Sequence, residues 1–511
     1  MTLLPLHRQL AVALILLTSA CQAGGSEAPD RQPPFRLRID PSKTYQTVEH
    51  FGASDAWSCQ FVGNWPSAKK NAIADLLFSR DTLIDGRPKG IGLSLWRFNI
   101  GGGTAEQGDA SGIRDEWRRA ESFAIPGNGY DWNRQAGQTW FLQAAKDRGV
   151  SRFLAFSNTP PVSLTVNGKG FATNGQPNLR EDRFDAYADF LADVVEGIRT
   201  KTGISLQYVS PFNEPQWDWS DGGQEGTPLF NDQLALAVRK ISGALSRRNS
   251  STLISLPEAG QIDYLYSDHN RPGRGSQVQA FFSPSSPQFL GDLKNVDRAI
   301  SGHSYFTTSP YAAAAQQRKK LSASFPENVR FWQSEYCVLG DNDGELRGEG
   351  RDLGMTTALY VARVLHNDLV NANATAWHWW LAISPYDYKD GLVYVDKNKT
   401  DGQYYSSKTL WAMGNFSRFV RPGAVRVAVT ETDPAEGLLV SSYRNADNQL
   451  VTILVNSRPE AREVQLAVSD KALVPVRVYE TSETKDLAPV NLTSGTLTLA
   501  PRSVITVISR L

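Results

Sequence analysis

The chain has 511 residues, and the 41% of them that are hydrophobic are enough for a sizeable folded core. Its 53 Lys and Arg residues equal its 53 Asp and Glu residues, so the formal net charge is zero at pH 7. This balance gives no attraction for nucleic acid or for an acidic membrane surface, and we expect neither as a partner.

The N-terminal residues have the pattern of a targeting segment. Residues 1–20 contain an apolar run that is too short to span a bilayer, and we interpret them as a signal peptide. The small residues before Cys21 are typical of a bacterial lipoprotein, in which Cys21 is acylated; plain secretion after cleavage at Ala20 is the alternative. Residues 21–34 are rich in Gly, Ser and Pro and predict a flexible tether. We therefore expect a protein that is secreted or held in the outer cell envelope of a bacterium.

Residues 35–46 predict a single strand, and residues 47–415 predict a barrel. In the barrel region, short apolar runs alternate with loops rich in Gly, Pro and Asn and with amphipathic helices such as residues 184–198. This alternation predicts parallel strands connected by helices, and eight such units predict an α/β fold of the (β/α)8 barrel type. The predicted strands are residues 48–54, 93–100, 153–157, 208–213, 253–256, 299–305, 329–335 and 375–380.

The pattern changes after residue 416. Seven short apolar runs are separated by turn residues such as Asn445 and Asp447, and no helical pattern occurs among them. Residues 416–511 therefore predict an all-β module, most simply a β-sandwich, which the strand at residues 35–46 joins from its N-terminal side.

Two glutamates lie where a parallel barrel places its working residues, at the C-terminal ends of strands. Glu214 follows the fourth predicted strand within Asn-Glu-Pro, and Glu335 ends the seventh. Cleavage of a glycosidic bond requires one carboxyl group that protonates the leaving oxygen and a second that faces the anomeric carbon. The fourth and seventh strands lie on opposite sides of a barrel mouth, so this pair can flank one bond. Each glutamate taken alone is equally consistent with a surface acid at a strand end.

The segments around these strand ends resemble glycoside hydrolase family 30, which belongs to the large clan A of retaining barrel hydrolases. The matching segments cover nearly the whole chain after the tether: residues 51–57, 96–103, 157–161, 210–215, 303–305, 332–336 and 377–380. The resemblance implies a barrel with a β-sandwich completed by the N-terminal strand, with Glu214 as acid/base and Glu335 as nucleophile. It reaches closest to the galactan-active members, which implies β-1,6-galactan in arabinogalactan side chains as the substrate. A β-1,6-glucanase or a xylanase of the same family is the alternative.

Four further residues are expected to support this pair. Arg97 ends an apolar strand, and a buried Arg needs carboxylate partners, so pairing with Glu335 should hold that side chain ionised. Asn213 precedes the acid, and in the resembled clan this Asn binds the sugar 2-hydroxyl. Tyr305 is placed to donate to the nucleophile. His303 points the same way from the same strand, although a satisfied core histidine fits it equally well.

A second group of residues is expected to contact the sugar. Aromatic rings stack on sugar faces, and the candidates are Trp57, Trp217, Trp219, Trp377, Trp379 and Trp380. Trp379 and Trp380 alternate in direction along their strand, so at most one of these two faces the lumen.

Two acidic residues complete the predicted site. Asp55 is a candidate for a terminal sugar hydroxyl, and Glu258 is a third carboxylate that we expect at the mouth and in contact with substrate.

Other classes of function fit the sequence less well. The six histidines are scattered, without the clustered ligands of a metal-dependent hydrolase, so we expect no metal and no cofactor. A non-catalytic glycan-binding lipoprotein is the alternative of another class, but such a protein would not need both glutamates. Cys59 and Cys337 lack metal-site spacing, and whether they pair stays open. We expect a monomer that acts on a polysaccharide or oligosaccharide.

Overall fold

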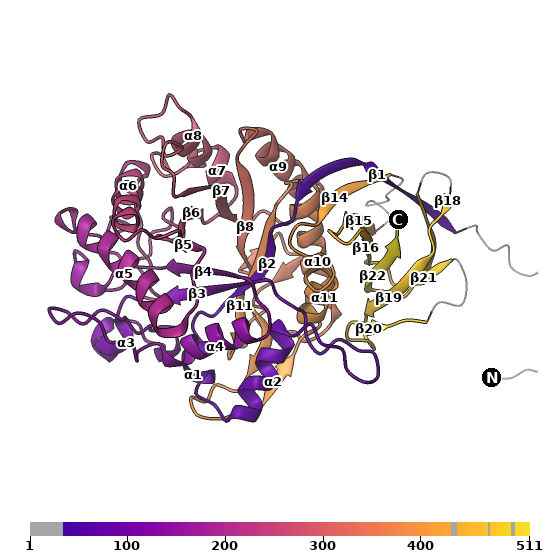
Figure 1. The fold of residues 1–511 in the computed structure, drawn as a ribbon, viewed down its shortest axis with the longest axis horizontal. Coiled ribbons are helices and arrows are strands. Elements are labelled where there is room, and N and C mark those ends of the chain that lie inside the picture. Colours follow the sequence, from indigo (N-terminus) through magenta and orange to yellow (C-terminus); the bar gives the residue numbers. More distant parts are fainter. Residues whose placement is uncertain (1–33, 431–436, 469–470, 492–495) are drawn as a thin grey trace, which may run out of the picture.

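A computed structural model describes residues 34–430, 437–468, 471–491 and 496–511. The predicted signal peptide, Cys21 and the tether as far as residue 33 lie outside the described residues. The described chain forms two bodies that lie side by side, a barrel and an all-β domain (Figure 1). In this part of the chain, no helix combines the length and apolar character that crossing a membrane requires.

Eight parallel strands close the barrel, which confirms the predicted fold class. They follow the chain in spatial order, and β11 pairs with both β8 and β2, which closes the circle. Every residue of β3 and β11 is buried, as expected for strands that face side chains within the barrel and helices outside it. The strands are β2 (His50–Ser54), β3 (Leu95–Ile100), β4 (Arg152–Ser157), β5 (Tyr208–Ser210), β6 (Leu253–Ala259), β7 (Val296–His303), β8 (Arg330–Tyr336) and β11 (Ala376–Ser384).

The helices between these strands cover the barrel. The longest, α5 (Phe184–Thr202), buries one stripe against the strands and ends at Gly203, whose left-handed φ of 65° is the usual way to end a helix. The other long helices are α2 (Ser67–Phe78), α4 (Ala136–Asp147), α6 (Asn231–Arg247), α9 (Tyr311–Ser324), α10 (Met355–Val370) and α11 (Lys408–Ser417). The short ones are α1 (Cys59–Val62), α3 (Thr104–Gln107), α7 (Asp263–Tyr266) and α8 (Gln277–Phe282). Two more strands, β12 (Gly391–Val395) and β13 (Tyr404–Ser406), extend the sheet beside β11.

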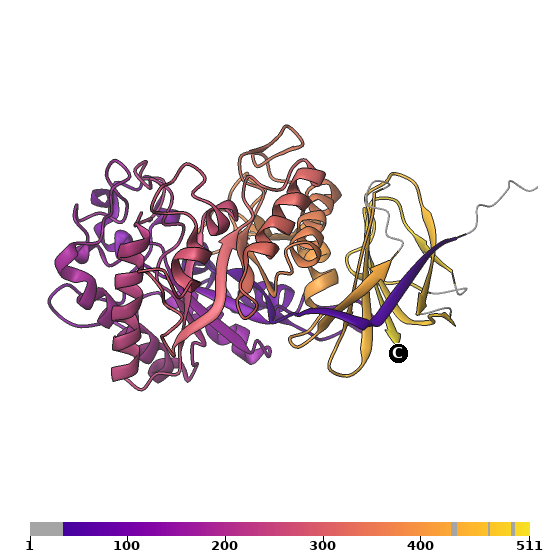
Figure 2. The same cartoon turned by 90° about the horizontal axis from the view of Figure 1, so that it is seen from above.

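The second body is the β-sandwich, and the N-terminal strand β1 (Phe35–Thr47) belongs to it. β1 pairs in parallel with β17 (Arg462–Val468) and antiparallel with β14 (Val425–Thr430). It therefore lies between two strands of the sandwich that are distant from it in sequence (Figure 2). The sandwich has an apolar core of its own, which includes Leu37, Leu454, Val464 and Ile505. The remaining strands are β14 (Val425–Thr430), β15 (Leu438–Arg444), β16 (Gln449–Asn456), β17 (Arg462–Val468), β18 (Lys471–Ala472), β19 (Pro475–Thr481), β20 (Ala488–Pro489), β21 (Leu497–Leu499) and β22 (Ser503–Arg510).

Helices α10 and α11 join the two bodies. Asn415 on α11 donates to Thr506 Oγ1 at 2.9 Å and accepts from Thr481 Oγ1 at 2.7 Å, and all three side chains are buried. Val451 and Ile508 of the sandwich belong to the same apolar cluster as the barrel core. The junction is therefore a packed interface and holds the sandwich against the barrel.

A buried ion pair fixes the segment that follows β7. Arg318 on α9 donates to Asp368 of α10 at 2.8 Å, and both side chains are 0% exposed. Asp368 also accepts from Ser304 Oγ at 3.0 Å and from Trp377 Nε1 at 2.9 Å. Since Ser304 lies between His303 and Tyr305, this charge pair sets the position of two predicted site residues.

We expect Arg318→Met to destabilise the fold by about 3–5 kcal/mol, because it leaves the Asp368 carboxylate buried without its positive partner. The matched control is Arg347→Met, which breaks an ion pair with Asp341 whose side chains are 71% and 48% exposed. The control should cost at most about 1 kcal/mol. Urea unfolding followed by tryptophan fluorescence measures both variants, and equal losses would contradict a structural role for the buried pair.

Candidate active site

Charged side chains that lie on, or directly after, five of the barrel strands meet near the C-terminal end of the barrel. They form the floor of the candidate site. Arg97 lies on β3, Glu258 on β6, His303 at the end of β7 and Glu335 on β8. Glu214 follows β5, beyond its last residue Ser210. Parallel strands end at the same rim, which is why residues as far apart in sequence as Arg97 and Glu335 meet here.

The backbone holds Glu214 in an uncommon conformation. Its φ is +48°, in the left-handed region that residues with a Cβ rarely occupy. Its N–H donates to Glu258 O at 2.9 Å, and its own carbonyl accepts from Trp219 Nε1 at 2.9 Å. Such strain persists only where the surroundings enforce it, and it is concentrated at functional sites. The Asn-Glu-Pro motif gave no sign of this feature.

Arg97 connects three of the floor residues. Its guanidinium donates to Glu335 Oε2 at 2.6 Å, to Glu258 Oε2 at 2.8 Å and to Asn213 Oδ1 at 3.1 Å. The face of the guanidinium lies 3.6 Å from the centroid of the Phe156 ring. Because Arg97 is fully buried, its charge requires these carboxylates, and in return it fixes their positions.

His303 and Tyr305 complete the network. His303 Nδ1 lies 2.7 Å from Glu214 Oε1, and its Nε2 lies 3.3 Å from Glu258 Oε2. Tyr305 donates its hydroxyl to Glu335 Oε1 at 3.0 Å, so each oxygen of Glu335 has a donor. A carboxylate oxygen of Glu214 and one of Glu335 lie within 4.8 Å of each other.

Burial and charge act against each other on this floor. Burial disfavours the charged form of His303, but the charge of Glu335 and the hydrogen bonds with Glu214 and Glu258 outweigh it and raise the pKa of His303 to about 10. Burial would raise the pKa of Glu258, yet Arg97 and His303 hold that pKa well below its usual value. Glu258 and Arg97 are therefore a permanent ion pair beneath the site.

The expectation that pairing with Arg97 keeps the pKa of Glu335 from rising is wrong. Burial raises its pKa, and the carboxylates of Glu214 and Glu258 add to this, whereas His303 and Arg97 lower it; the pKa ends above the usual value. Reasoning from the Arg97 pair alone left out the cost of burial and the two neighbouring carboxylates.

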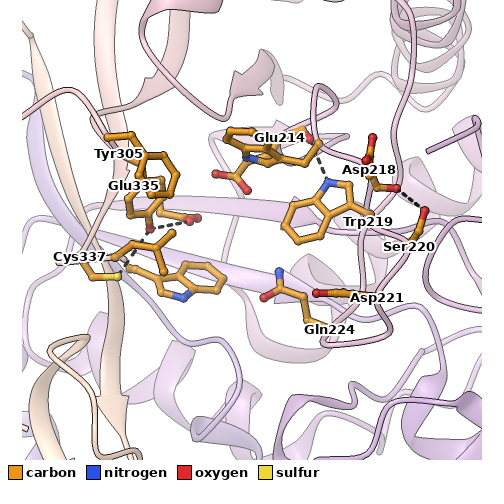
Figure 3. Close-up of a pocket in the computed structure, with 13 residues that line it drawn as sticks. Glu214, Asp218, Trp219, Ser220, Asp221, Gln224, Tyr305, Glu335 and Cys337 are labelled. Carbon is orange, nitrogen blue, oxygen red and sulfur yellow. Dashed lines mark hydrogen bonds between the residues drawn. The ribbon is translucent and has the colours of Figure 1, made fainter. Parts of the chain in front are cut away.

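A pocket of about 710 Å³ opens above the floor. Glu214, Trp219 and Asp218 lie on one side of it, and Tyr305, Glu335 and Cys337 lie on the other (Figure 3). Aromatic rings form much of its wall, and the full lining is Glu214, Trp217, Asp218, Trp219, Ser220, Asp221, Gln224, Tyr305, Phe306, Glu335, Cys337, Leu339 and Trp380. The chain thus places two carboxylates and several aromatic faces around one space, which suits a sugar ring.

Several residues that were predicted to contact the sugar do not line this pocket. Trp377 and Trp379 are 0% exposed, and their indole N–H groups donate to Asp368 Oδ2 and to Asp390 O. The interpretation of these two rings as sugar-stacking surfaces is therefore wrong. Breaks in register occur around both residues in the pairing of β11, and the ring that faces the pocket is that of Trp380.

Trp57 and Asp55 likewise lie behind the pocket wall. Trp57 is 4% exposed, and its ring packs edge-on against Trp380 with centroids 5.3 Å apart. Asp55 is fully buried and accepts from Asn99 N at 2.7 Å, which joins β2 to β3. Both were expected to contact the sugar, and both instead support the residues that line the pocket.

Glu258 also lies elsewhere than expected. It is 0% exposed and is absent from the pocket lining, because Arg97 and His303 enclose it below the floor. The expected substrate contact is therefore wrong, and the buried position of Glu258 explains its charge pairing. Trp217 does line the pocket, half-buried, with its ring edge-on to that of Phe306.

A buried glutamate that the sequence did not reveal supports one wall of the site. Glu225 accepts from Thr104 Oγ1 at 2.6 Å and from Gly102 N at 3.2 Å, which joins the loop after β5 to the loop after β3. A Cβ on Gly102 would lie 2.4 Å from Thr159 Cγ2, so only glycine fits there. Burial raises the pKa of Glu225 to about 7.

Glu214, His303 and Glu335 are one group with the spacing of metal ligands among the described residues. The raised pKa of His303 keeps both ring nitrogens protonated at neutral pH, and a protonated imidazole cannot bind a metal. The residues therefore fit a hydrogen-bonded network. Cys59 and Cys337 are both free thiols, and Cys337 lies at the pocket, where its Sγ is 3.9 Å from the Tyr305 hydroxyl.

Comparison with known proteins identifies two matching families of domains. A family model described as O-Glycosyl hydrolase family 30 matches residues 34–394, and one described as Glycosyl hydrolase family 30 beta sandwich domain matches residues 423–507. The solved structure of a conserved exported protein from Bacteroides fragilis is 33% identical, with a TM-score of 0.86, over 92% of this chain and 99% of that one.

Two of the similar proteins are named for an enzymatic activity. An endo-β-1,6-galactanase of Hypocrea rufa is 24% identical over 82% of this chain and 81% of its own length. A glucuronoxylanase, XynC, of Bacillus subtilis is 25% identical over 65% of this chain and 66% of its own length.

The charge of His303 predicts a specific pH dependence of stability. Its pKa in the folded chain, about 10, exceeds the ordinary value of 6.5, so the stabilisation is complete below pH 6.5 and is lost as pH rises towards 10. We expect the difference in unfolding free energy between the native chain and His303→Gln to shrink over this range, by at most about 1.4 kcal/mol per pH unit.

Urea unfolding of both chains at a series of pH values measures this difference. The groups common to both chains, such as Glu225, cancel in the comparison. A difference that stays constant from pH 6 to pH 10 would show that His303 is neutral in the folded chain.

Proposed function

Since the chain belongs to O-glycosyl hydrolase family 30, we propose that Glu214 and Glu335 are the catalytic pair with which it hydrolyses β-linked polysaccharide, and that its substrate is β-1,6-galactan. The observation that carries the catalytic assignment is the approach of the two carboxylates to within 4.8 Å across the pocket. Retaining enzymes hold their two carboxyl groups about 5–5.5 Å apart, whereas inverting enzymes leave about 6.5–9.5 Å for a water molecule.

The contacts of each carboxylate support its role. Glu335 is held at both oxygens, by Arg97 and by Tyr305, which fixes the orientation that a nucleophilic carboxylate needs. Glu214 has no contact with Arg97 and lines the pocket beside Trp219. It is the carboxyl group placed to exchange a proton with the leaving oxygen.

The ion pairs of the floor distinguish Glu214 from the other two carboxylates. Three carboxylates, Glu214, Glu258 and Glu335, face two cations, Arg97 and His303, which leaves one negative charge unbalanced in a buried site. Glu214 is the carboxylate without a guanidinium partner, whereas Arg97 pairs with both of the others.

The proposed reaction has two steps. In the first, Glu335 forms a bond to the anomeric carbon while Glu214 gives its proton to the departing glycosidic oxygen. In the second, Glu214 takes a proton from water, and the resulting hydroxide replaces Glu335 on the anomeric carbon. Each displacement inverts the anomeric carbon, and two inversions restore its configuration, so the product keeps the configuration of the substrate.

The pocket lining favours a neutral glycan. Glu214, Asp218, Asp221 and Glu335 are all in the lining, and none of its residues is Lys or Arg. A uronate group would meet these carboxylates without a compensating cation, which costs binding energy. Together with the galactanase relative, this supports β-1,6-galactan ahead of an acidic xylan. A polysaccharide substrate also fits the proposed location outside the cell.

A glucuronic-acid-bearing xylan is the second candidate, and a neighbouring hollow favours it. This hollow, of about 470 Å³, shares Asp221 with the main pocket and contains Arg114 and Arg118. Arg118 lies 5.1 Å from the ring centroids of both Trp57 and Tyr386. An acidic side group that reached beyond the main pocket would meet these two cations.

We expect Glu335→Gln to abolish turnover, because the amide cannot form the glycosyl ester. Glu214→Gln should lower kcat on polysaccharide by about 10²–10⁴-fold, the usual worth of general acid catalysis, and should lower it far less on an aryl glycoside whose leaving group needs no proton. Steady-state rates on both substrates measure this.

The matched control is Glu349→Gln, an exposed glutamate in the loop after β8, which should leave both rates unchanged. Proton NMR of the first-formed product should show the anomer of the substrate. Wild-type rates for Glu335→Gln on the aryl glycoside, or an inverted first product, would each refute the assignment.

The substrate is tested by separate incubations with de-arabinosylated arabinogalactan, pustulan and glucuronoxylan. We expect galacto-oligosaccharides from the first and no products from the other two. Products from glucuronoxylan alone would overturn the galactan proposal. They would favour the second candidate if Arg118→Gln or reduction of the uronate groups removed the activity. No products from any glycan would instead support a non-catalytic binding protein.

A further inference from the structure

A second polar hollow lies at the junction of the barrel and the sandwich. It has a volume of about 220 Å³ and shares no lining residue with the active-site pocket. The barrel side contributes the segment after α2 and the segment after α11, and the sandwich side contributes β16, β19 and β22 with the turn that precedes β16. The lining is almost wholly polar and consists of Arg80, Thr82, Arg418, Phe419, Asn445, Asp447, Gln449, Val451, Arg477, Tyr479 and Ile508.

The pairing of the sandwich strands shows which of their residues face this hollow. Arg477 of β19 lies opposite Ile508 of β22, which in turn lies opposite Val451 of β16. Val451 and Ile508 are buried in the cluster that includes the barrel core, so this row faces the barrel. Arg477 is exposed at the edge of the row and therefore carries its charge towards the junction.

Arginines from the barrel side converge on the same place. A Cβ built on Gly92 would lie 3.0 Å from Arg80 Cγ, 3.5 Å from Arg421 Nη1 and 3.7 Å from Arg418 Cα. Three arginine residues therefore pack around one glycine, and Arg80 and Arg418 line the hollow itself.

Arg418, which is buried, and Arg421, which is half-buried, have neutral partners. Arg418 donates to the carbonyl oxygens of Ser79, Gly90, Arg80 and Asp81 at 2.6–3.1 Å. Arg421 donates to the carbonyl oxygens of Gly92 at 2.6 Å and Ser417 at 2.7 Å. These bonds satisfy the N–H groups and leave both positive charges without a counter-charge.

The neighbouring acids do not balance this charge. Arg80, Arg418, Arg421 and Arg477 are four cations, and among the described residues none of them has a salt bridge. Asp447 is the carboxylate in the lining, and it accepts from Gln449 N at 3.1 Å.

The arginine charges repel one another. Burial lowers the pKa of Arg421 to about 10, and the charges of Arg80 and Arg418 act in the same direction. Burial also lowers the pKa of Arg418, with Arg80 and Arg477 adding to the effect and Tyr479 and Asp81 opposing it. A bound anion would relieve this repulsion.

We propose that this hollow binds a tetrahedral oxyanion, a phosphate or sulfate group, between Arg80 of the barrel and Arg477 of the sandwich. Both guanidinium groups are exposed and free to donate, and the side-chain amide of Gln449 in the lining adds a neutral donor. The volume suits one small anion rather than a glycan chain, and the lining offers little apolar surface on which a sugar could stack. The anion joins the two bodies and stabilises their junction.

The full chain is titrated with inorganic phosphate and inorganic sulfate at low millimolar concentration by calorimetry, with sodium chloride of matched ionic strength as reference. Glucose 6-sulfate against glucose distinguishes a sulfate ester on a glycan from a free anion. We expect saturable binding of the oxyanions, and a rise in the thermal unfolding midpoint that chloride does not produce. Arg80→Gln and Arg477→Gln should each weaken binding at least tenfold and leave glycosidase activity unchanged.

The matched control is Arg199→Gln, an exposed arginine of α5 that pairs with Glu196, and it should bind oxyanions like the native chain. Without anion, Arg477→Gln should unfold at a higher temperature than the native chain, because one repelling charge is gone. Equal stabilisation by phosphate and chloride, or native affinity in Arg80→Gln and Arg477→Gln, would overturn the proposal.

Discussion

The buried charge of Arg97 is the constraint on which the active site depends. A guanidinium that is 0% exposed is stable only beside carboxylates, and here they come from β6 and β8. Each of these bonds crosses the barrel interior, so the same interactions that stabilise Arg97 hold Glu258 and Glu335 in fixed positions. Because the partners sit on strands, the geometry is set before substrate enters, which is what catalysis by positioned charge requires.

The second cation, His303, extends this arrangement to Glu214. It contacts Glu214 and Glu258 through different ring nitrogens, and the ion pair between Arg318 and Asp368 fixes the adjoining Ser304. The buried ion pairs and hydrogen bonds thus form a connected network from α9 to the pocket floor. Removing one charge leaves its buried partners with fewer counter-charges, so the stability of the barrel and the geometry of the site rest on the same residues.

Much of this architecture was readable from the sequence, because it rests on periodicity and strand ends. Short apolar runs such as residues 93–100 predict buried parallel strands, and the position of Glu214 and Glu335 after two of them predicts their meeting across the mouth. The predictions that failed concern the direction in which a side chain points and how deeply it is buried. Trp377 and Trp379 share a face, as alternation requires, but only three-dimensional packing decides that this face meets α10 while Trp380 meets the pocket. Glu258 sits at a strand end as Glu214 and Glu335 do, and no local pattern shows that Arg97 and His303 enclose it.

The division between strands and loops explains why membership of the family identifies the type of reaction but does not identify the glycan. The charged floor lies on or directly after barrel strands, whereas Asp218, Asp221 and Gln224 lie in the loop between β5 and α6. Loops tolerate substitution far better than packed strands, so a relative that is 24% identical can keep the floor and change the walls. The charged floor therefore consists of residues that cannot move independently. In the proposed function, the balance between the carboxylates of one loop and Arg118 of another decides which polysaccharide the pocket accepts.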